Sequence, residues 1–298
     1  MTRRVVASCP AKVNLGLSVL GRRDDGFHEI ATIFQAIDLE DRLEVVEAAS
    51  LSLTCDDPSV PADERNLVLH AARELQERFP SARSRGASIA LAKAIPAGAG
   101  LGGGSSDAAG AILALASLWE LDLDASVRGE IASAIGSDVP FFLHGGRALA
   151  TGRGEVITAL PPGPSRPLIV GTPARPLSTA EVYRALAAPL TPPEPAVTVT
   201  RFLVKLAEGN DFARAENDLE RAALTMRPEL AAFKGALLDR GAEVALLCGS
   251  GSSVFGMFAG TAEAKEAATR LRGAFPGWTV RVARTVALGA RITAEAGS

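Results

Sequence analysis

The sequence has few of the residues that build metal centres and disulfide frameworks. Its 298 residues include three cysteines, Cys9, Cys55 and Cys248, and only three histidines. The cysteines are odd in number, scattered and without a C-x-x-C pair, and the histidines form no H-x-x-x-H pair. Such cysteine usage is typical of a reducing compartment, and it excludes a zinc site or a disulfide framework built on these spacings.

An excess of positive charge and long hydrophobic runs are also missing. The formal net charge is −3, which argues against a nucleic-acid binder because such a protein needs a basic face to displace counterions. No apolar run approaches the roughly 18 residues of a membrane span. The start, MTRRVVASC, resembles a lipoprotein cleavage box, but its apolar stretch is too short for a signal peptide. We therefore expect a cytoplasmic protein that binds neither nucleic acid nor membrane.

The composition is that of an ordinary globular chain. With 47% hydrophobic and 22% charged residues, the chain can bury a sizeable core, and its length suits one large domain or two ordinary ones. Prolines cluster at 160–168, which indicates a domain boundary near residue 160, and at 189–196, which indicates a surface loop. We expect an N-terminal domain over 1–160 and a C-terminal domain over 161–298.

Strand patterns precede helix patterns in the first half. Apolar residues alternate over 13–19, which predicts a strand buried on one face, and residues 28–48 predict a strand, a turn and a second strand. Apolar spacing predicts helices over 67–79, 105–119 and 126–135. Ser105 or Ser106 suits the N-cap of the second helix, and Asp107 suits its first turn.

The second half mixes strands and helices, so the fold class is α+β. Four strands and four helices are predicted there, at 168–171, 242–247, 254–258 and 279–284 for the strands and at 179–188, 199–208, 229–239 and 262–271 for the helices.

Five glycines occupy the seven positions 98–104, and this run contains the pattern G-x-G-x-x-G. A dinucleotide-binding fold would need a second strand that ends in an acid about 20 residues further on. Glu120 and Asp122 fall near that distance, but they lie between two predicted helices. A Walker loop would need a lysine directly after the glycines, and the V-A-I-K and H-R-D patterns would mark a protein kinase; the sequence has none of these.

A lysine-free phosphate site remains as the interpretation of this run. Backbone amides and the N-terminus of the following helix would hold the phosphates, and glycine would let the backbone approach them closely. The alternative is a flexible turn before a buried helix, but five glycines carry a heavy entropic cost for a turn that two could make. We therefore predict phosphate binding between Pro96 and Ser106.

Several segments together resemble the GHMP kinases. Residues 95–109 resemble the P-x-x-x-G-L-G-S-S-A-A motif of that family, and residues 246–258 resemble its C-terminal glycine motif. Residues 9–45, with P-A-K-x-N-L and the turn G-R-R-x-D-G-F-H, are similar to one branch, as are 136–155 and ENDLE at 216–220. The resemblance implies a two-domain GHMP kinase fold, with an N-terminal domain like ribosomal protein S5 domain 2 and a ferredoxin-like α/β C-terminal domain.

For activity, the resemblance implies an ATP-dependent kinase of a small molecule. The branch phosphorylates the 2-hydroxyl of 4-diphosphocytidyl-2-C-methyl-D-erythritol in non-mevalonate isoprenoid precursor biosynthesis, with Mg²⁺ accompanying ATP, and we expect a monomer or weak homodimer. A different GHMP kinase, such as homoserine kinase, would not need the G-R-R-x-D-G-F-H turn. A non-catalytic member would be expected to lack Lys12 or Asp138, and the sequence has both.

The resemblance assigns catalysis to Asp138 as general base and to Lys12 as the cation beside it. From the residues alone, a turn aspartate after Gly136 is the favoured interpretation of Asp138, because aspartate is common in turns. Lys12 could be a strand lysine that points to solvent, although its apolar neighbours make a charge on the wrong face costly.

The resemblance also implies a cytosine slot. Phe27 and Tyr183 would be its walls, His28 would read the edge of the base, and Asn14 would contact the substrate near Lys12. Phe27 stands where the branch more often has tyrosine, so stacking would survive without the hydroxyl. Core packing is the alternative for Phe27, and the buried face of an amphipathic helix is the alternative for Tyr183.

ATP binding is assigned by the same resemblance to the glycine loop and to Asn66, which could instead be an N-cap. Ser106 and Asp107 are candidate Mg²⁺ ligands, although coordination through water is usual for this ion. Ser252 and Ser253 depart from the C-terminal motif of the family, which could alter that loop without removing backbone donors. The loop residues so assigned are Pro96, Ala97, Gly98, Ala99, Gly100, Leu101, Gly102, Gly103, Gly104, Ser105 and Ser106.

Overall fold

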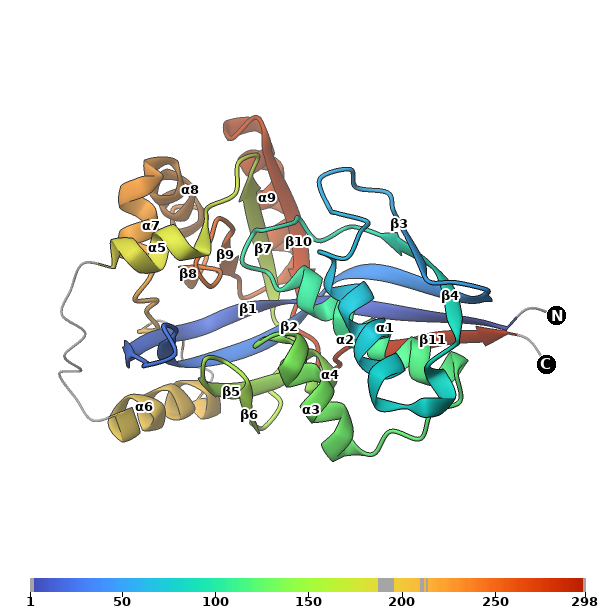
Figure 1. Cartoon of the computed structure of the whole chain (residues 1–298). Helices are drawn as coiled ribbons and strands as arrows, with labels where there is room; N and C mark the ends of the chain where they lie inside the picture. Colours follow the sequence, from blue (N-terminus) through green and yellow to red (C-terminus); the bar gives the residue numbers. More distant parts are fainter. Residues whose placement is uncertain (1–2, 187–195, 210–211, 213, 297–298) are drawn as a thin grey trace.

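A computed structural model describes residues 3–186, 196–209, 212 and 214–296 (Figure 1). The surface loop predicted at 189–196 lies almost wholly outside these residues, since only residue 196, the first of a helix, is described. No helix of the described part of the chain is long and apolar enough to cross a membrane.

The first half of the chain forms one mixed sheet with helices packed on it. Its strands are β1 (Arg4–Arg22), β2 (His28–Ala48), β3 (Ser52–Cys55), β4 (Gly86–Ala92), β5 (Arg147–Gly152) and β6 (Val156–Ala159). Its helices are α1 (Leu67–Arg78), the 3₁₀ turn η1 (Pro80–Ala82), α2 (Gly103–Leu118), α3 (Ala125–Ile135) and α4 (Val139–His144).

The second half forms a smaller sheet with its own helices. Its strands are β7 (Pro167–Pro173), β8 (Val244–Leu247), β9 (Val254–Met257) and β10 (Trp278–Arg284), followed by a last strand, β11 (Arg291–Ala296). Its helices are α5 (Thr179–Ala185), α6 (Ala196–Gly209), α7 (Glu220–Met226), α8 (Pro228–Leu238) and α9 (Thr261–Ala274).

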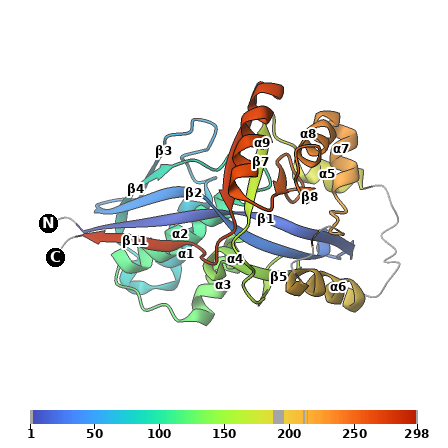
Figure 2. The same cartoon turned by 180° about the vertical axis from the view of Figure 1, so that it is seen from behind.

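The strand orders define the fold. The first sheet runs β11-β1-β2-β4-β3. Strand β5 pairs with the first part of β2, and β6 pairs with β5. The second runs β10-β7-β9-β8 with antiparallel neighbours, which is the ferredoxin-like order. Seen from behind, β11 lies alongside β1, so the end of the chain returns to the first sheet (Figure 2). The division of the chain into two domains at residue 160 stays a prediction. Strand β11 comes after residue 160 and yet pairs with β1 in the first sheet.

Strand β1 is buried on both faces, so the expectation of a half-buried strand was wrong. Val5, Ala7 and Cys9 pack in a core with α1 and α2, whereas Val13 and Leu15 pack in a second core with residues of β7 and β9. The pairing register of β1 against β2 shifts between Pro10 and Ala11. Because Pro10 pairs with Glu40 and Ala11 with Ile37, β2 carries two extra residues there, and a shift of two residues keeps each side chain on its face. Lys12 lies against the ring of Phe34, which packs in the core with α1 and α2.

Two further expectations need correction. Residues 28–48 form the single strand β2, without the predicted turn. Helix α2 begins at Gly103 with Gly102 as its N-cap, so neither Ser105 nor Ser106 is the cap, and Asp107 lies beyond the first turn. The helix is buried along most of its length, as its alanine-rich sequence indicates.

Candidate active site

The glycine run is a tight loop between β4 and α2. Gly98, Gly100 and Gly102 have φ values of +64°, +78° and +74°, which L-residues with a side chain rarely adopt. An added Cβ on Gly100 would lie 2.0 Å from the carbonyl oxygen of Cys248. Glycine is therefore needed here both for backbone conformation and for contact with the C-terminal glycine segment.

The C-terminal glycine segment, residues 246–258, packs directly against this loop. The amide of Ser253 donates to the carbonyl of Ala99 at 3.1 Å, and its hydroxyl lies 2.7 Å from that of Thr172. Asn217, in ENDLE, donates to the carbonyls of Leu247 and Gly249 at 3.0 and 2.8 Å. Ser253, one of the two serines that depart from the family motif, therefore leaves the backbone contact between the two segments in place.

One cavity of about 1070 Å³ lies beside the glycine loop. Residues 96–100 and 102–105 line it, together with the second half of β1, the first part of β2, the start of α4, and α5. The N-terminus of α2 therefore adjoins this space, where its free amides and positive dipole end favour an anion. Volume and lining suit a site for two small molecules.

Lys12 lies in this cavity wall and does not point to solvent. Its side chain is 5% exposed, and its Nζ donates to Asn14 Oδ1 at 3.0 Å. Asn14 Nδ2 donates to Thr32 Oγ1 at 2.9 Å, and that hydroxyl donates to the carbonyl of Gly16 at 2.6 Å. The ammonium also lies 4.8 Å from the centre of the Phe34 ring. This chain of hydrogen bonds fixes the direction of the lysine.

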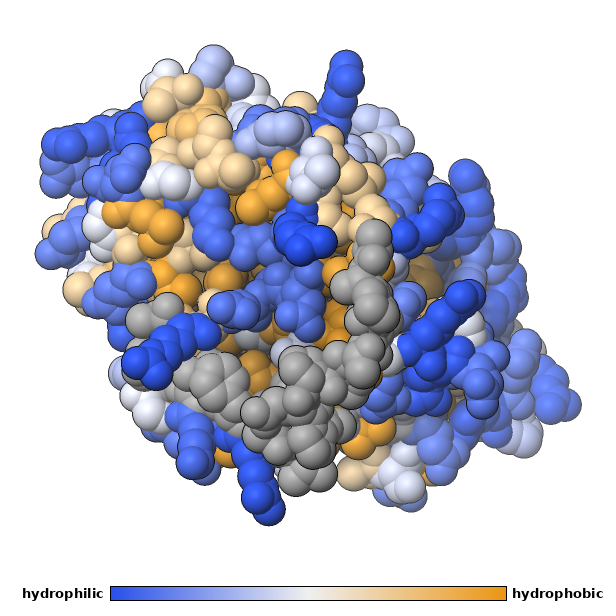
Figure 3. Space-filling model, turned by 90° about the vertical axis from the view of Figure 1, so that its left-hand side faces the viewer, coloured by the Kyte–Doolittle hydropathy of each residue, from blue (hydrophilic) through white to orange (hydrophobic). Residues whose placement is uncertain are grey.

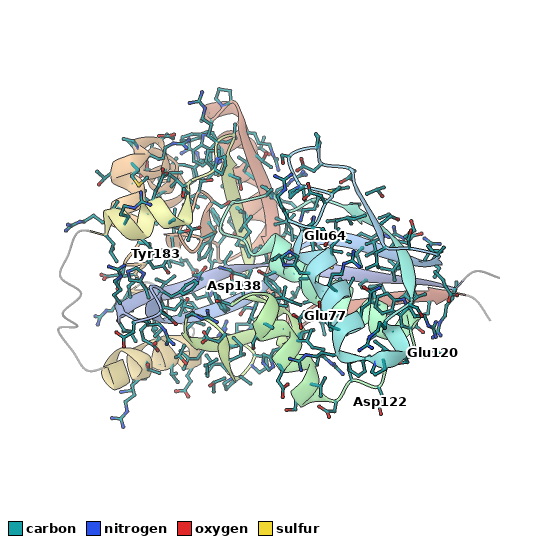
Figure 4. The ribbon with its side chains drawn as sticks, in the orientation of Figure 1. Glu64, Glu77, Glu120, Asp122, Asp138 and Tyr183 are labelled. Atoms are coloured by element: carbon teal, nitrogen blue, oxygen red, sulfur yellow. The ribbon has the colours of Figure 1, made fainter. Side chains whose placement is uncertain are left out.

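Asp138 faces Lys12 across a short gap. Its Oδ2 lies 3.6 Å from Lys12 Nζ, and its side chain is 30% exposed toward the cavity. The residue occupies the N-cap position of α4, but its side chain makes no capping hydrogen bond. Asp138 and Tyr183 lie near one another, whereas Glu120 and Asp122 lie at the opposite end of the molecule (Figure 4). The carboxylate is thus available to a ligand and not used by the helix.

Aromatic rings gather at the other end of the cavity. The rings of His28 and Tyr183 stack with centroids 4.7 Å apart, so Tyr183 faces the histidine and not Phe27. Phe27 is 53% exposed, and the guanidinium of Arg153 lies 4.9 Å from its ring centre. Burial, with a smaller effect of Asp138, raises the pKa of Tyr183 to about 12, and burial together with Arg22 lowers the pKa of His28.

Charged groups at this end were missed from the sequence. Arg22, Arg153 and Arg184 line the cavity, and neither Arg22 nor Arg184 forms an ion pair with a described residue. Figure 3 shows the end of the molecule that carries α5 and α6, where hydrophilic and hydrophobic side chains intermingle. The sequence could have pointed to Arg22, in the G-R-R-x-D-G-F-H turn, and to Arg153, in ATGRGE, whereas Arg184 stands in ordinary helix sequence.

Asn66 has the capping role that the sequence left open. Its Oδ1 accepts from the amide of Val68 at 3.0 Å, and its Nδ2 donates to the carbonyl of Pro61 at 2.7 Å. The neighbouring Leu67, rather than Asn66, lines the cavity. Both polar atoms of the asparagine are therefore engaged in fixing the start of α1.

The residues suggested for Mg²⁺ differ in their suitability. Asp107 is buried and pairs with Lys93 at 2.6 Å, so a second cation beside it would meet the ammonium. Ser106 Oγ is buried and has no hydrogen-bond partner among the described residues. Within the described part of the chain, no three His, Cys, Asp or Glu side chains are grouped for a metal ion. Ser106 is therefore the better candidate of the two for Mg²⁺, an ion that usually keeps phosphate and water ligands.

A glycine loop at a helix N-terminus, beside a lysine–aspartate pair in a two-sheet fold, defines a small-molecule phosphotransferase of the GHMP type. Residues 66–146 match the family described as GHMP kinases N terminal domain, and residues 203–277 match GHMP kinases C terminal. The 4-diphosphocytidyl-2-C-methyl-D-erythritol kinase of Pelotomaculum thermopropionicum is 42% identical over 90% of this chain and 94% of its own. That of Bacillus subtilis is 39% identical over 91% and 93%.

Solved structures agree with the sequence relatives. A crystal structure of 4-(cytidine 5'-diphospho)-2C-methyl-D-erythritol kinase matches with a TM-score of 0.75 at 37% identity, over 94% of this chain and 98% of the other. A homoserine kinase from Cytophaga hutchinsonii also gives 0.75, at 21% identity over 97% of both chains, which shows the shared fold alone. The chain belongs to the GHMP kinase family, and within it to the branch that these relatives represent. The protein is a small-molecule kinase.

Proposed function

We propose that the protein transfers the γ-phosphoryl group of ATP to the 2-hydroxyl of 4-diphosphocytidyl-2-C-methyl-D-erythritol. The observation that carries this proposal is the pairing of Lys12 with Asp138, 3.6 Å apart in the cavity that the glycine loop also lines. The relatives at 42% and 39% identity are named for this substrate. The protein would act in the cytoplasm as a monomer or weak homodimer, in non-mevalonate isoprenoid precursor biosynthesis.

The reaction needs one proton acceptor and stabilisation of negative charge. Asp138 would take the proton of the attacking hydroxyl, a bond would form between that oxygen and the γ-phosphorus, and the bond from the γ-phosphorus to the bridging oxygen of ADP would break. Lys12 would hold Asp138 in place and stabilise the charge on the transferred group. Phosphoryl transfer depends mostly on such positioning and electrostatics.

The glycine loop would hold the ATP phosphates from Pro96 to Ser106. Amides of an αL-rich loop and of a helix N-terminus are suited to phosphate oxygens. Mg²⁺ would neutralise charge on the β- and γ-phosphates when bound, with the buried hydroxyl of Ser106 a better candidate ligand than Asp107. Asn66 would support the nucleotide only indirectly, by fixing the start of α1.

The aromatic end of the cavity would hold the cytidine. Tyr183 and Phe27 would flank the base after His28 moves from the Tyr183 ring to the edge of the base, and Asn14 would contact the methylerythritol beside Lys12. The three arginines at this end would favour binding of the two phosphates of the substrate. Arg153 already contacts Phe27. Stacking of a base on an aromatic ring contributes roughly 1–3 kcal/mol in nucleic-acid complexes.

A coupled assay of ADP release tests the proposal directly. The purified protein should consume ATP with 4-diphosphocytidyl-2-C-methyl-D-erythritol and not with homoserine or mevalonate at the same concentration. Phosphorus NMR of the product should show a new monophosphate ester in place of the 2-hydroxyl. Equal or faster turnover of homoserine or mevalonate would refute the substrate assignment while leaving the kinase class intact.

A further inference from the structure

Three charged side chains lie together beneath the glycine loop, away from the cavity. Lys93 directly follows β4, Asp41 stands in β2, and Asp107 stands in α2. Lys93 Nζ lies 2.5 Å from Asp41 Oδ2 and 2.6 Å from Asp107 Oδ2. Their side chains are 5%, 0% and 3% exposed, so the three charges are almost completely removed from water.

The cluster contacts the backbone just before the glycine loop and the helix just after it. The second oxygen of Asp41, Oδ1, accepts from the amides of Ala94 and Ile95 at 2.6 and 2.8 Å, immediately before Pro96. Asp107 lies in the second turn of α2, immediately after the loop. Lys93 therefore links the entry of the phosphate loop to its exit, and β2 supplies the fixed point between them.

Burial of an ion cluster is poorly explained by stability alone. Removal of paired charges from water has a large desolvation cost, so apolar residues of similar volume often stabilise a fold as well or better. Here the cluster lies below a segment that glycine makes intrinsically loose, with φ above +60° at Gly98, Gly100 and Gly102. Such a segment needs directional contacts to hold its amides toward the phosphate site before ATP binds.

Hydrogen bonds from two other segments reach the middle of the loop. The amide of Lys12 donates to the carbonyl of Leu101 at 2.9 Å, and the amide of Ser253 donates to that of Ala99 at 3.1 Å. Lys93 also underlies the start of α2, because a Cβ on Gly103 would lie 3.3 Å from its Nζ. The two ends of the loop thus depend on Asp41, Lys93 and Asp107.

We propose that Lys93, Asp41 and Asp107 form a clamp that holds the two ends of the phosphate loop in its ATP-binding shape. The three are positioning residues that act on ATP through the loop amides. The proposal rests on the glycine loop as the ATP site, but it does not depend on which alcohol accepts the phosphoryl group.

Lys93→Met tests the clamp, with Lys234→Met as the matched control. Lys234 pairs with Glu220 at 2.7 Å in the second half of the chain and does not line the cavity. Calorimetry with a non-hydrolysable ATP analogue would give the dissociation constant, and hydrogen exchange of the free enzyme would give the protection of residues 96–104. For Lys93→Met we expect affinity to fall by about 10- to 100-fold, as for a misplaced binding group, and loop exchange to accelerate. For Lys234→Met we expect both to stay as in the wild type.

Asp41→Asn provides a second test if Lys93→Met does not fold. Asparagine keeps an acceptor for Ala94 and Ile95 but loses the charge that holds Lys93, so affinity should weaken less than in Lys93→Met. Lys93→Arg should restore part of the affinity. Unchanged affinity in the folded variants would overturn the proposal. Weaker affinity without faster loop exchange would also overturn it, because Lys93 would then contact the nucleotide directly. Because affinity is measured without turnover, these outcomes are separate from the identity of the acceptor substrate.

Discussion

Replacing Gly100 by alanine tests whether the two glycine segments must touch. The residue has φ of +78°, and the added methyl carbon would lie 2.0 Å from Cys248 O and 2.9 Å from Gly251 O. Both obstacles are backbone atoms of a turn that is closed by a hydrogen bond from Gly251 N to Cys248 O at 2.8 Å. No side-chain rotation can therefore relieve the contact, and one of the two segments has to move.

The expected cost follows from two effects. A left-handed backbone costs a residue with a Cβ about 1–2 kcal/mol, and forced overpacking costs about 1–3 kcal/mol. Together we expect Gly100→Ala to lower the free energy of unfolding by roughly 2–5 kcal/mol, which corresponds to a fall in Tm of roughly 5–15 °C. Displacement of the loop by about 1 Å should also lower kcat/KM for ATP by about 100-fold.

Thermal unfolding and steady-state kinetics of two variants measure this. Gly129→Ala is the matched control, because Gly129 stands in α3 and a Cβ there meets nothing within 4 Å. Alanine in a helix interior is favoured over glycine by about 1 kcal/mol, so the control should be at least as stable as the wild type and equally active. If Gly100→Ala kept both its Tm and its kcat/KM for ATP, the close contact between the segments would be disproved.

Three further predictions concern chemistry, substrate and pH. Asp138→Asn should lower kcat by at least about 1000-fold because a neutral amide cannot accept the proton, with ATP affinity by calorimetry within twofold; retained turnover would exclude Asp138 as base. Arg153→Ala should raise KM for the cytidyl substrate about 10- to 150-fold, as loss of a charged hydrogen bond does, and leave KM for ATP unchanged; an equal rise in both would place Arg153 elsewhere. Burial raises the pKa of Asp107 to about 7, so the folded protein binds a proton there that the unfolded chain releases, and stability falls as pH rises from about 4 to 7. Denaturant titrations of Asp107→Asn should show this variant gaining stability relative to the wild type between pH 5 and 8, and a pH-independent difference would contradict the raised pKa.

Local patterns were sufficient where one segment carries its own signal. The helix at 67–79 was predicted from apolar spacing, and the structure has α1 at Leu67–Arg78 with Asn66 as cap. The glycine run was identified as a loop before a buried helix because its composition has few other uses. Predictions of this kind depend on neighbours in the chain, and the neighbours are visible in the sequence.

The turn predicted within residues 28–48 shows where local patterns mislead. The segment DLED has turn composition, yet β2 runs through it because partners distant in the chain use its acids. Asp38 accepts from the amide of Arg284 at 2.7 Å, Glu40 pairs with Arg291 at 2.8 Å, and Asp41 holds Lys93. The pattern of apolar and polar residues over 28–48 does not indicate any of these contacts.

The cytosine slot was predicted as a pair of rings, and the placement of those rings depended on the tertiary structure. Tyr183 of α5 packs on His28, whereas Phe27 lies against Arg153 of the β5–β6 turn, so the two rings contact different segments. The roles of these residues stay predictions until the substrate variants are measured.

The order and spacing of motifs were enough to place this chain in the GHMP kinases, since glycine runs and the segments around Lys12 and Asp138 are continuous in the sequence. Which way Lys12 points was decided only in the folded molecule. Its ammonium lies 3.6 Å from Asp138, more than a hundred residues away in the chain, and 4.8 Å from the centre of the Phe34 ring on the neighbouring strand. Strand pairing and burial select that face because they are properties of the whole sheet, and a single strand does not contain them.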